Sequence, residues 1–196
     1  ELDYIRQSML QTNQYTTVIQ DAYGMGGNLS ALYPEAGENP LATQLQTIAR
    51  LINGGLQTKI YIANIGGFDT HANQVVAGDT AIGPHADLLA QINEAIVAFQ
   101  DDLSLMGRED EVIGMTFSEF GRRIASNDSW GTDHGAAAPL VVFGTKVNAE
   151  IFGANPEIPS EVEVQANVPM QFDFRSVYGS ILMDWFGVAE SVIHDI

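Results

Sequence analysis

The sequence predicts an α/β fold in which a mainly parallel, doubly wound sheet is flanked by helices. Three short apolar runs, at 59–65, 112–117 and 139–144, have the composition of strands that are covered on both faces. Amphipathic stretches with a helical repeat lie between and around these runs. Because folds of this class bind ligands in the loops that follow their strands, we expect the functional site in such loops.

Each predicted helix has an apolar face along one side and ends near a glycine. In the last of them, Asp173 is a good N-cap candidate and Gly187 marks the end. The third opens with proline, which is favoured in the first helical turn. The predicted helices cover residues 1–22, 41–52, Pro84 to just before Gly107, and 173–187.

The chain has the length and composition of one globular domain, so we expect residues 1–196 to form a single α/β domain. Within it, the proline-containing segment 145–172 is predicted to be peripheral. Residues 161–164 alternate between acidic and apolar side chains, as an edge strand does. The chain starts without methionine and within a helical pattern, so we expect it to be the C-terminal portion of a longer protein.

Composition excludes several classes of function. The 25 acidic and 8 basic side chains give a net charge of −17, which disfavours binding to nucleic acid and to anionic membranes. No apolar run is long enough for a membrane span, and residues 1–6 lack the pattern of a signal peptide. Cysteine is absent, so a bound metal would need oxygen and nitrogen ligands. A bound cation would also let so acidic a protein attract a small anionic substrate.

Two aspartate and histidine pairs indicate a metal site. Asp69 and His71 follow the run at 59–65, and Asp133 and His134 lie in a glycine-bounded loop. Carboxylate and neutral imidazole together suit zinc, manganese or iron, and two such sets about 4 Å apart would form a two-metal clamp. The pattern predicts a divalent metal and no organic cofactor.

Two further histidines have alternative interpretations. His85, in the first turn of the third helix, is either a fifth metal ligand or a buried histidine that is hydrogen-bonded to a carbonyl. His194 lies near the end of the sequence, where we expect it to be solvated.

Glu119 and Arg122 follow the run at 112–117 and are the candidate catalytic residues. Arg122, with its neighbour Arg123, can hold an anionic substrate, and Glu119 can orient or ligate. The alternative is a surface ion pair at the start of a helix. Ser118 lacks the glycine-flanked context of a hydrolase nucleophile.

Three motifs together resemble the domain-of-unknown-function family fifteen-oh-one. The resemblance runs from about residue 41 to 187, and it rests on the amino-acid sequences of all three motifs and on their order along the chain. They are Gly66-Gly67-Phe68-Asp69-Thr70-His71-Ala72-Asn73-Gln74, Phe117-Ser118-Glu119-Phe120-Gly121-Arg122 and Gly131-Thr132-Asp133-His134-Gly135.

The resemblance implies membership of the alkaline phosphatase and sulfatase-like superfamily, whose members are metal-dependent hydrolases or mutases on a doubly wound sheet. It implies a hydrolase of phosphate or sulfate esters and a periplasmic or secreted location. Superfamily members take their nucleophile and one metal-binding aspartate from the first strand of the fold. We therefore expect the hydrolase to be incomplete within these 196 residues. The alternative is a non-catalytic exported binding or structural protein on the same fold.

Overall fold

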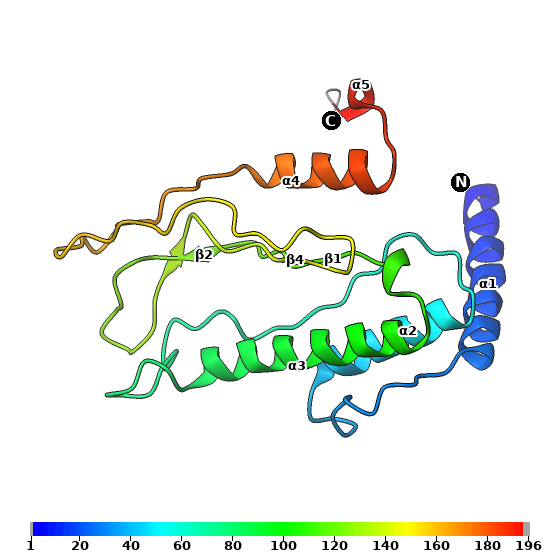
Figure 1. Ribbon diagram of the computed structural model, residues 1–196, viewed down its shortest axis with the longest axis horizontal. Coiled ribbons are helices and arrows are strands. Elements are labelled where there is room, and N and C mark those ends of the chain that lie inside the picture. Colours follow the sequence, from blue (N-terminus) through cyan, green and yellow to red (C-terminus); the bar gives the residue numbers. More distant parts are fainter. Residues whose placement is uncertain (1, 194–196) are drawn as a thin grey trace.

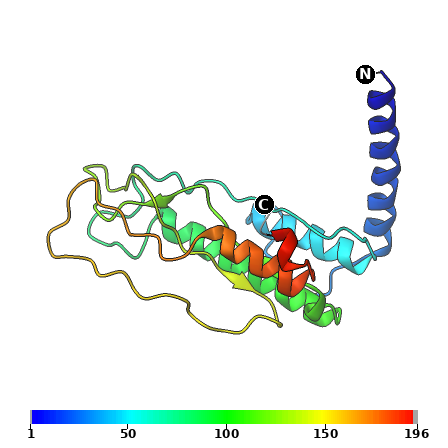
Figure 2. The same cartoon turned by 90° about the horizontal axis from the view of Figure 1, so that it is seen from above.

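The computed structural model describes residues 2–193, in which helices dominate and strands are short. Helices α2 and α3 form one layer, extended chain with the strands forms the middle, and α4 lies on the opposite side (Figure 1). Figure 2 shows α1 standing crosswise at one end of this assembly. The helical elements are α1 (Leu2–Met25), α2 (Pro40–Asn53), α3 (Pro84–Leu105), the 3₁₀ turn η1 (Glu109–Glu111), α4 (Phe174–Ser180), the π-helical turn η2 (Ile181–Trp185) and α5 (Glu190–Ile193).

The predicted helices are confirmed, and their ends follow from capping. Asn39 precedes α2 and its side-chain oxygen accepts hydrogen bonds from the backbone N–H groups of Leu41 and Ala42, both at 3.1 Å. Pro84 opens α3, and Gly107 beyond its end has a φ of +68°, which glycine adopts readily. Asp173 caps α4 through the backbone N–H of Arg175 at 2.9 Å.

The core lies where α2 packs on α3. The fully buried apolar positions are alanines and Leu103, which allows the two helices to approach closely. Partly buried side chains, most of them from α2, α3 and the run at 59–65, complete two clusters. The buried core residues of these two helices are Leu41, Ala42, Ala49, Leu51, Ala95, Ala98, Phe99 and Leu103.

A buried carboxylate ties the connection between α1 and α2 to this core. Asp102 of α3 is fully buried. Its carboxylate accepts hydrogen bonds from the backbone N–H groups of Leu29 and Ser30, at 2.6 and 3.0 Å, and from the side-chain amide of Asn28 at 2.7 Å. These bonds offset the desolvation of the charge, so the loop is fixed to α3.

The mainly parallel sheet that the sequence predicts is not found among residues 2–193. The prediction was wrong in the direction of the strands and in the size of the sheet. Each of the two sheets in the described residues has two strands, and both pairs are antiparallel. The strands cover only parts of the predicted runs at 112–117 and 139–144, and one pair lies outside them. They are β1 (Gly114–Met115) with β4 (Val142–Phe143), and β2 (Gly121–Arg122) with β3 (His134–Gly135).

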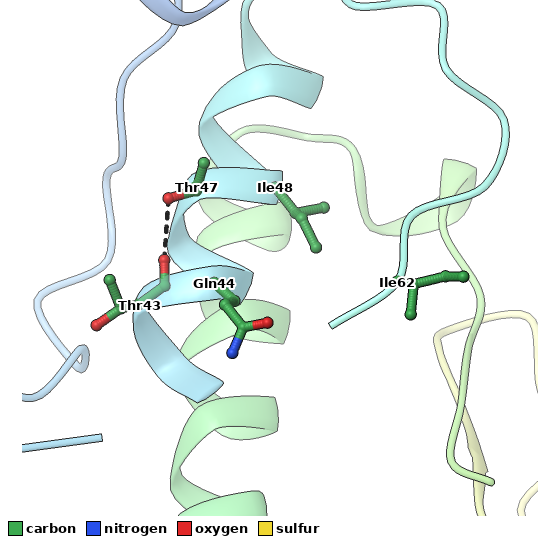
Figure 3. A pocket seen from close by; sticks show the side chains of 5 residues that line it. All are labelled: Thr43, Gln44, Thr47, Ile48 and Ile62. Carbon is green, nitrogen blue, oxygen red and sulfur yellow. Dashed lines mark hydrogen bonds between the residues drawn. The ribbon is translucent and has the colours of Figure 1, made fainter. Parts of the chain in front are cut away.

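The run at 59–65 does not form a strand because it is held by side chains of α2 and not by a neighbouring strand. Gln44 donates to the carbonyl of Asn64 at 2.8 Å and accepts from its N–H at 2.9 Å. Ala63 and Ile65 pack on the core, whereas Ile62 is 75% exposed. Figure 3 shows Ile62 facing α2 across a hollow of about 260 Å³.

The segment 145–172 runs along the outside of the molecule, and the alternating residues 161–164 are not a strand. Their side chains are largely exposed. The segment is joined to the β2–β3 region by an isolated bridge between Arg123 and Asn167 and by hydrogen bonds to Ala166 and Asn167 from the backbone N–H groups of Ile124 and Ala136. None of the helices in residues 2–193 combines the length and apolarity that a bilayer span requires. His194 lies outside the described residues.

Replacing Asp102 with alanine should destabilise the fold by roughly 3 kcal/mol, because three partly buried donors lose a charged acceptor. Within residues 2–193, the matched control Asp101 accepts one hydrogen bond, from the Ser30 hydroxyl, so its alanine variant should cost less than about 1 kcal/mol. Urea denaturation of both variants measures the difference. Equal losses of stability would show that the Asp102 carboxylate does not anchor the loop.

Candidate metal centre

Two loops that are distant in sequence form the site. Residues 66–74 lead toward α3, and residues 127–134 lead into β3. Backbone hydrogen bonds join the loops, from Thr132 N–H to the Thr70 carbonyl at 3.3 Å and from Gln74 N–H to the Trp130 carbonyl at 2.9 Å. Gly131 lies so close to the backbone of His71 that a Cβ there would be 2.2 Å from the His71 carbonyl oxygen. The loops therefore meet at a position that only glycine can occupy.

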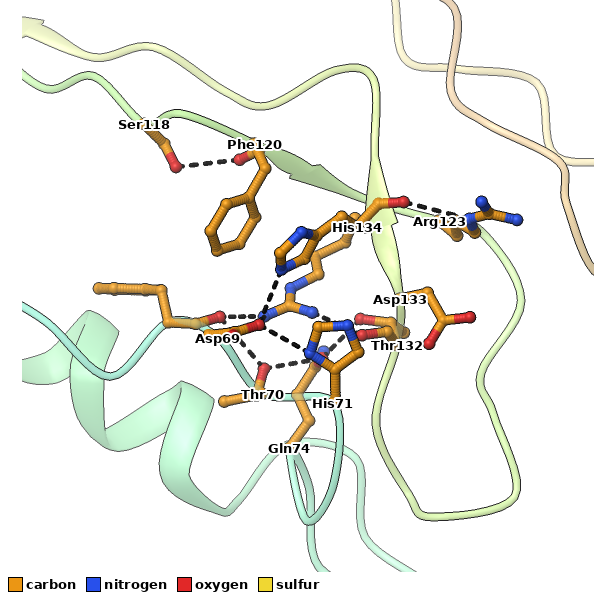
Figure 4. A network of polar contacts seen from close by, with 12 residues as sticks. Asp69, Thr70, His71, Gln74, Ser118, Phe120, Arg123, Thr132, Asp133 and His134 are labelled. Carbon is orange, nitrogen blue, oxygen red and sulfur yellow. Dashed lines mark hydrogen bonds and ion pairs between the residues drawn. The ribbon is translucent and has the colours of Figure 1, made fainter.

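Three potential metal ligands converge where the loops meet (Figure 4). The Oδ1 atom of Asp69 lies 2.7 Å from Nδ1 of His71 and 2.7 Å from Nε2 of His134. One donor atom from each of the three residues lies within 4.8 Å of the other two, and all three residues are exposed. A single divalent ion can be held by such a set, with a side left open to solvent.

The β2–β3 pair sets the orientation of the His134 ring. Arg122 is paired with His134 across the two strands, and the neighbouring Phe120 stacks on the imidazole with ring centroids 3.9 Å apart and planes 13° apart. Gly135 allows the strands to approach, since a Cβ there would be 2.4 Å from the Arg122 carbonyl oxygen. The imidazole is thus supported by a ring face and points its Nε2 atom at Asp69.

Arg122 ties both ligand-bearing loops to β2. Its guanidinium donates to the carbonyl of Thr132 at 2.5 Å and to the carbonyl of Phe68, the residue before Asp69. A guanidinium nitrogen also lies 3.8 Å from the Asp69 carboxylate, and the Arg122 side chain is only 17% exposed. The planar fork of arginine suits such a double contact, so Arg122 fixes the distance between the loops.

Asp69 is suited to stay ionised. The hydrogen bond from His134 lowers the pKa of Asp69 below its usual value, desolvation opposes this, and the charge of the nearby His71 adds to the lowering. The result is a carboxylate that carries its negative charge at neutral pH in front of two imidazoles.

The hydroxyl groups nearest the site are engaged in other bonds. Thr70 and Thr132 both donate to the side-chain oxygen of Gln74, at 3.1 and 2.7 Å, and Ser118 donates to the carbonyl of Phe120 at 2.9 Å. Within the part of the chain that the structure describes, none of these hydroxyls is hydrogen-bonded to a general base. They therefore hold the loops together and lack the activation that a nucleophile needs.

The structure brings together Asp69, His71 and His134 but leaves out two predicted ligands. The carboxylate of Asp133 lies beside the side-chain amide of Asn127, at 3.4 Å, and is not part of the cluster. Its neighbour His134 reaches the cluster instead, because adjacent side chains in an extended chain point to opposite sides.

His85 matches neither of its two sequence interpretations. Its ring packs edge-on against Phe68 at 5.7 Å, and its buried Nδ1 atom has no hydrogen-bond partner among residues 2–193. Burial lowers the pKa of His85, and the positive charge of Arg122 adds to this effect. His85 is therefore a neutral ring behind the Asp69 loop.

Glu119 is exposed and outside the cluster. The alternative interpretation, a surface ion pair at the start of a helix, is not seen in the described residues, since Arg123 donates to the carbonyl of His134 at 3.1 Å and Arg122 donates to the loop carbonyls. The roles of Glu119 and Arg122 toward a substrate stay predictions.

Sequence reasoning missed the residues that support the ligands. Asn127 donates to the His71 carbonyl at 2.8 Å and accepts from the backbone N–H groups of Ser129 and Gly131 at 2.9 and 3.1 Å. The succession Asn127-Asp128-Ser129 consists of residues that favour turns, and this was a recognisable signal. Gln74 and Phe120 lie inside the recognised motifs, but their partners become evident only in three dimensions.

The family described as Protein of unknown function (DUF1501) matches residues 6–196 of this chain. No curated protein matches the chain, and no solved structure matches it either.

Alanine at Asp69, His71 or His134 should each weaken zinc binding by about 100-fold or more, because each removes one of three ligands. Asp133→Ala, from the second loop, and His85→Phe, from the first turn of α3, are the controls, and both should bind zinc as the parent does. Competition with a chromophoric chelator measures all five affinities. Loss of binding in Asp133→Ala equal to that in His134→Ala would contradict the three-residue site.

Stability should depend on pH through His85. Because its pKa is lower in the folded than in the unfolded chain, the unfolded chain takes up the proton first as pH falls. The contribution of neutral His85 to the free energy of unfolding is complete above its pKa in the unfolded chain, about 6.5. It is lost as pH falls from that value toward the lower pKa of the folded chain. His85→Phe should flatten this part of the curve of unfolding free energy against pH. Identical slopes for variant and parent would rule the effect out.

Proposed function

We propose that this chain, which belongs to the DUF1501 family, holds one divalent metal ion through Asp69, His71 and His134 and uses it to hydrolyse phosphate or sulfate esters. One observation carries the proposal. A single carboxylate oxygen and two imidazole nitrogens, from loops more than sixty residues apart, meet at 2.7 Å in a solvent-accessible position.

The donor set fits the ion that the sequence predicts. One carboxylate with two imidazoles suits zinc, manganese or iron. Bonds of about 2.0–2.2 Å place two ligands of one ion at most about 4.4 Å apart. The three donor atoms already lie within 4.8 Å of one another, so small side-chain adjustments are enough.

The exposure of the ligands favours catalysis over a purely structural role. Structural sites are closed by four protein ligands, whereas catalytic sites keep a position for water or substrate. Asp69, His71 and His134 are all exposed and supply three ligands. This observation supports the hydrolase proposal over the alternative of a non-catalytic binding or structural protein.

A divalent ion in this position supplies Lewis acidity and lowers the pKa of coordinated water. Residues of the chain would hold the ion and orient its ligands. Asp69 contributes a negative charge, the stacked ring of Phe120 steadies His134, and Arg122 holds both loops in place. With a net charge of −17, the protein repels an anionic ester except where positive charge is concentrated, and Arg122 is the neighbouring cation.

The proposed placement in the alkaline phosphatase and sulfatase-like superfamily rests on the three motifs, and so does the periplasmic or secreted location. Members of that superfamily draw a nucleophile and a further aspartate from an earlier strand. The engaged hydroxyls of Thr70, Thr132 and Ser118 are consistent with a nucleophile supplied from elsewhere. We propose that these residues supply the later part of a hydrolase site.

Ester hydrolysis tests the proposal directly. This chain and a version extended at its N-terminus are assayed with p-nitrophenyl phosphate and p-nitrophenyl sulfate in the presence of zinc, manganese or iron(II). We expect metal-dependent turnover by the extended protein, its loss on His134→Ala, and its retention on His85→Phe. Turnover that persists in His134→Ala would contradict the assignment.

Arg122→Ala should weaken metal binding by about 10- to 100-fold, because the loops that carry Asp69 and His134 lose their common donor. Arg122→Lys should not restore binding, since an ammonium group lacks the fork that reaches two carbonyls. The chelator competition assay measures both variants. Unchanged metal affinity together with a raised KM would instead assign Arg122 to anion binding.

A further inference from the structure

A second hollow adjoins the metal centre and is lined by the same two loops. It has a volume of about 310 Å³, near the lower end of the range for small-molecule pockets. Gln74 and Thr132 line it, and Thr132 lies two residues before the ligand His134. Gly131 lines it as well and rests against the backbone of His71. A molecule in this hollow would thus contact both loops that carry the metal ligands.

Trp130 lines the hollow in a conformation that tryptophan rarely adopts. Its φ is +56°, in the left-handed region that a bulky side chain seldom occupies, and the residue is 53% exposed. Asn127 holds this turn by accepting from the N–H groups on either side of Trp130, those of Ser129 and Gly131. Backbone strain that its surroundings enforce gathers at functional sites. Here it presents a large aromatic side chain to solvent beside a metal centre.

The polar groups around Trp130 are neutral and could form hydrogen bonds to a ligand. Thr80 and Ser126 line the hollow, and within residues 2–193 their hydroxyls make no hydrogen bond. The side-chain oxygen of Gln74 accepts from two threonines, whereas its amide nitrogen has no partner in the same range. No charged side chain lines the hollow. It therefore offers one aromatic surface and several neutral hydrogen-bonding groups.

We propose that this hollow binds a neutral hexose ring. This inference rests on the proposed function, because the hexose would be the alcohol part of the ester whose anionic group lies at the metal centre. A hexose has an apolar face that covers an aromatic ring and hydroxyls around its edge that bond to neutral polar groups. An anionic group is disfavoured here, because no cation lines the hollow and the protein is strongly acidic.

Tryptophan fluorescence tests the proposal on the metal-free chain. The sequence has two tryptophans, so Trp185→Phe leaves Trp130 as the only one. We expect glucose, galactose or mannose to change its emission saturably, with a dissociation constant on the order of millimolar. Adenosine, a flat aromatic ligand, is the comparison. Absence of saturation with all three hexoses, or saturation by adenosine alone, would overturn the proposal.

Variants at Trp130 separate binding from folding. Trp130→Gly removes the aromatic ring and also relieves the positive φ, so the melting temperature should not fall while hexose affinity, measured by calorimetry, drops about tenfold or more. Trp130→Tyr keeps an aromatic ring and should retain most of the affinity. Unchanged hexose affinity in Trp130→Gly would overturn the proposal.

The same titrations distinguish failure of this inference from failure of the metal site. Asp69→Ala should lose zinc and keep hexose binding, whereas Trp130→Gly should keep zinc and lose hexose. Zinc binding without hexose binding in the parent would reject the hexose pocket alone. Hexose binding without zinc binding would reject the metal centre alone.

Discussion

One carboxylate oxygen, Oδ1 of Asp69, joins the two halves of the site. It accepts from ring nitrogens of His71, two residues away, and of His134, 65 residues away. Closing a loop of 65 residues costs conformational entropy, and other interactions between the two loops must offset that cost. That support comes from Arg122, which bonds to both loops, and from Gly131, which lets them touch. The ligands are thereby organised before any ion binds, which reduces the cost of binding.

The charges around Asp69 and in the neighbouring hollow bear on which ligands each can bind. In the function that we propose, the ionised Asp69 beside two imidazoles would attract a divalent cation, and the bound cation would reverse the local field for an anionic ester. Next to this charged centre lies a hollow without charged side chains. The two environments suit a substrate with one anionic end and one neutral, hydroxyl-rich end.

Sequence reasoning was accurate where local rules decide the structure. Pro84 and Asp173 begin their helices through local capping and backbone preferences, and these were recognisable without coordinates. Strand pairing depends on distant partners. The run at 59–65 has the composition of a strand, but Gln44 of α2 satisfies the backbone of Asn64 near its end. Apolar composition alone does not distinguish these outcomes.

The same limit applied to the site. Repeated aspartate and histidine pairs correctly indicated that two distant loops meet, because such pairs rarely recur by chance in a chain with four histidines. Which member of each pair turns toward the centre depends on backbone direction in the loop, so Asp133 and His134 were indistinguishable in sequence. The partly buried ring of His85, whose Nδ1 atom has no hydrogen-bond partner among residues 2–193, likewise depends on Phe68 and Arg122 around it.

The most direct test of the account is zinc titration of the metal-free chain with X-ray absorption spectroscopy of the bound ion. We predict one ion per chain, with two imidazoles and a carboxylate oxygen among its ligands, and loss of one imidazole in His71→Ala. Binding of two ions, or a ligand shell without imidazole, would contradict the central claim that Asp69, His71 and His134 form a single metal centre.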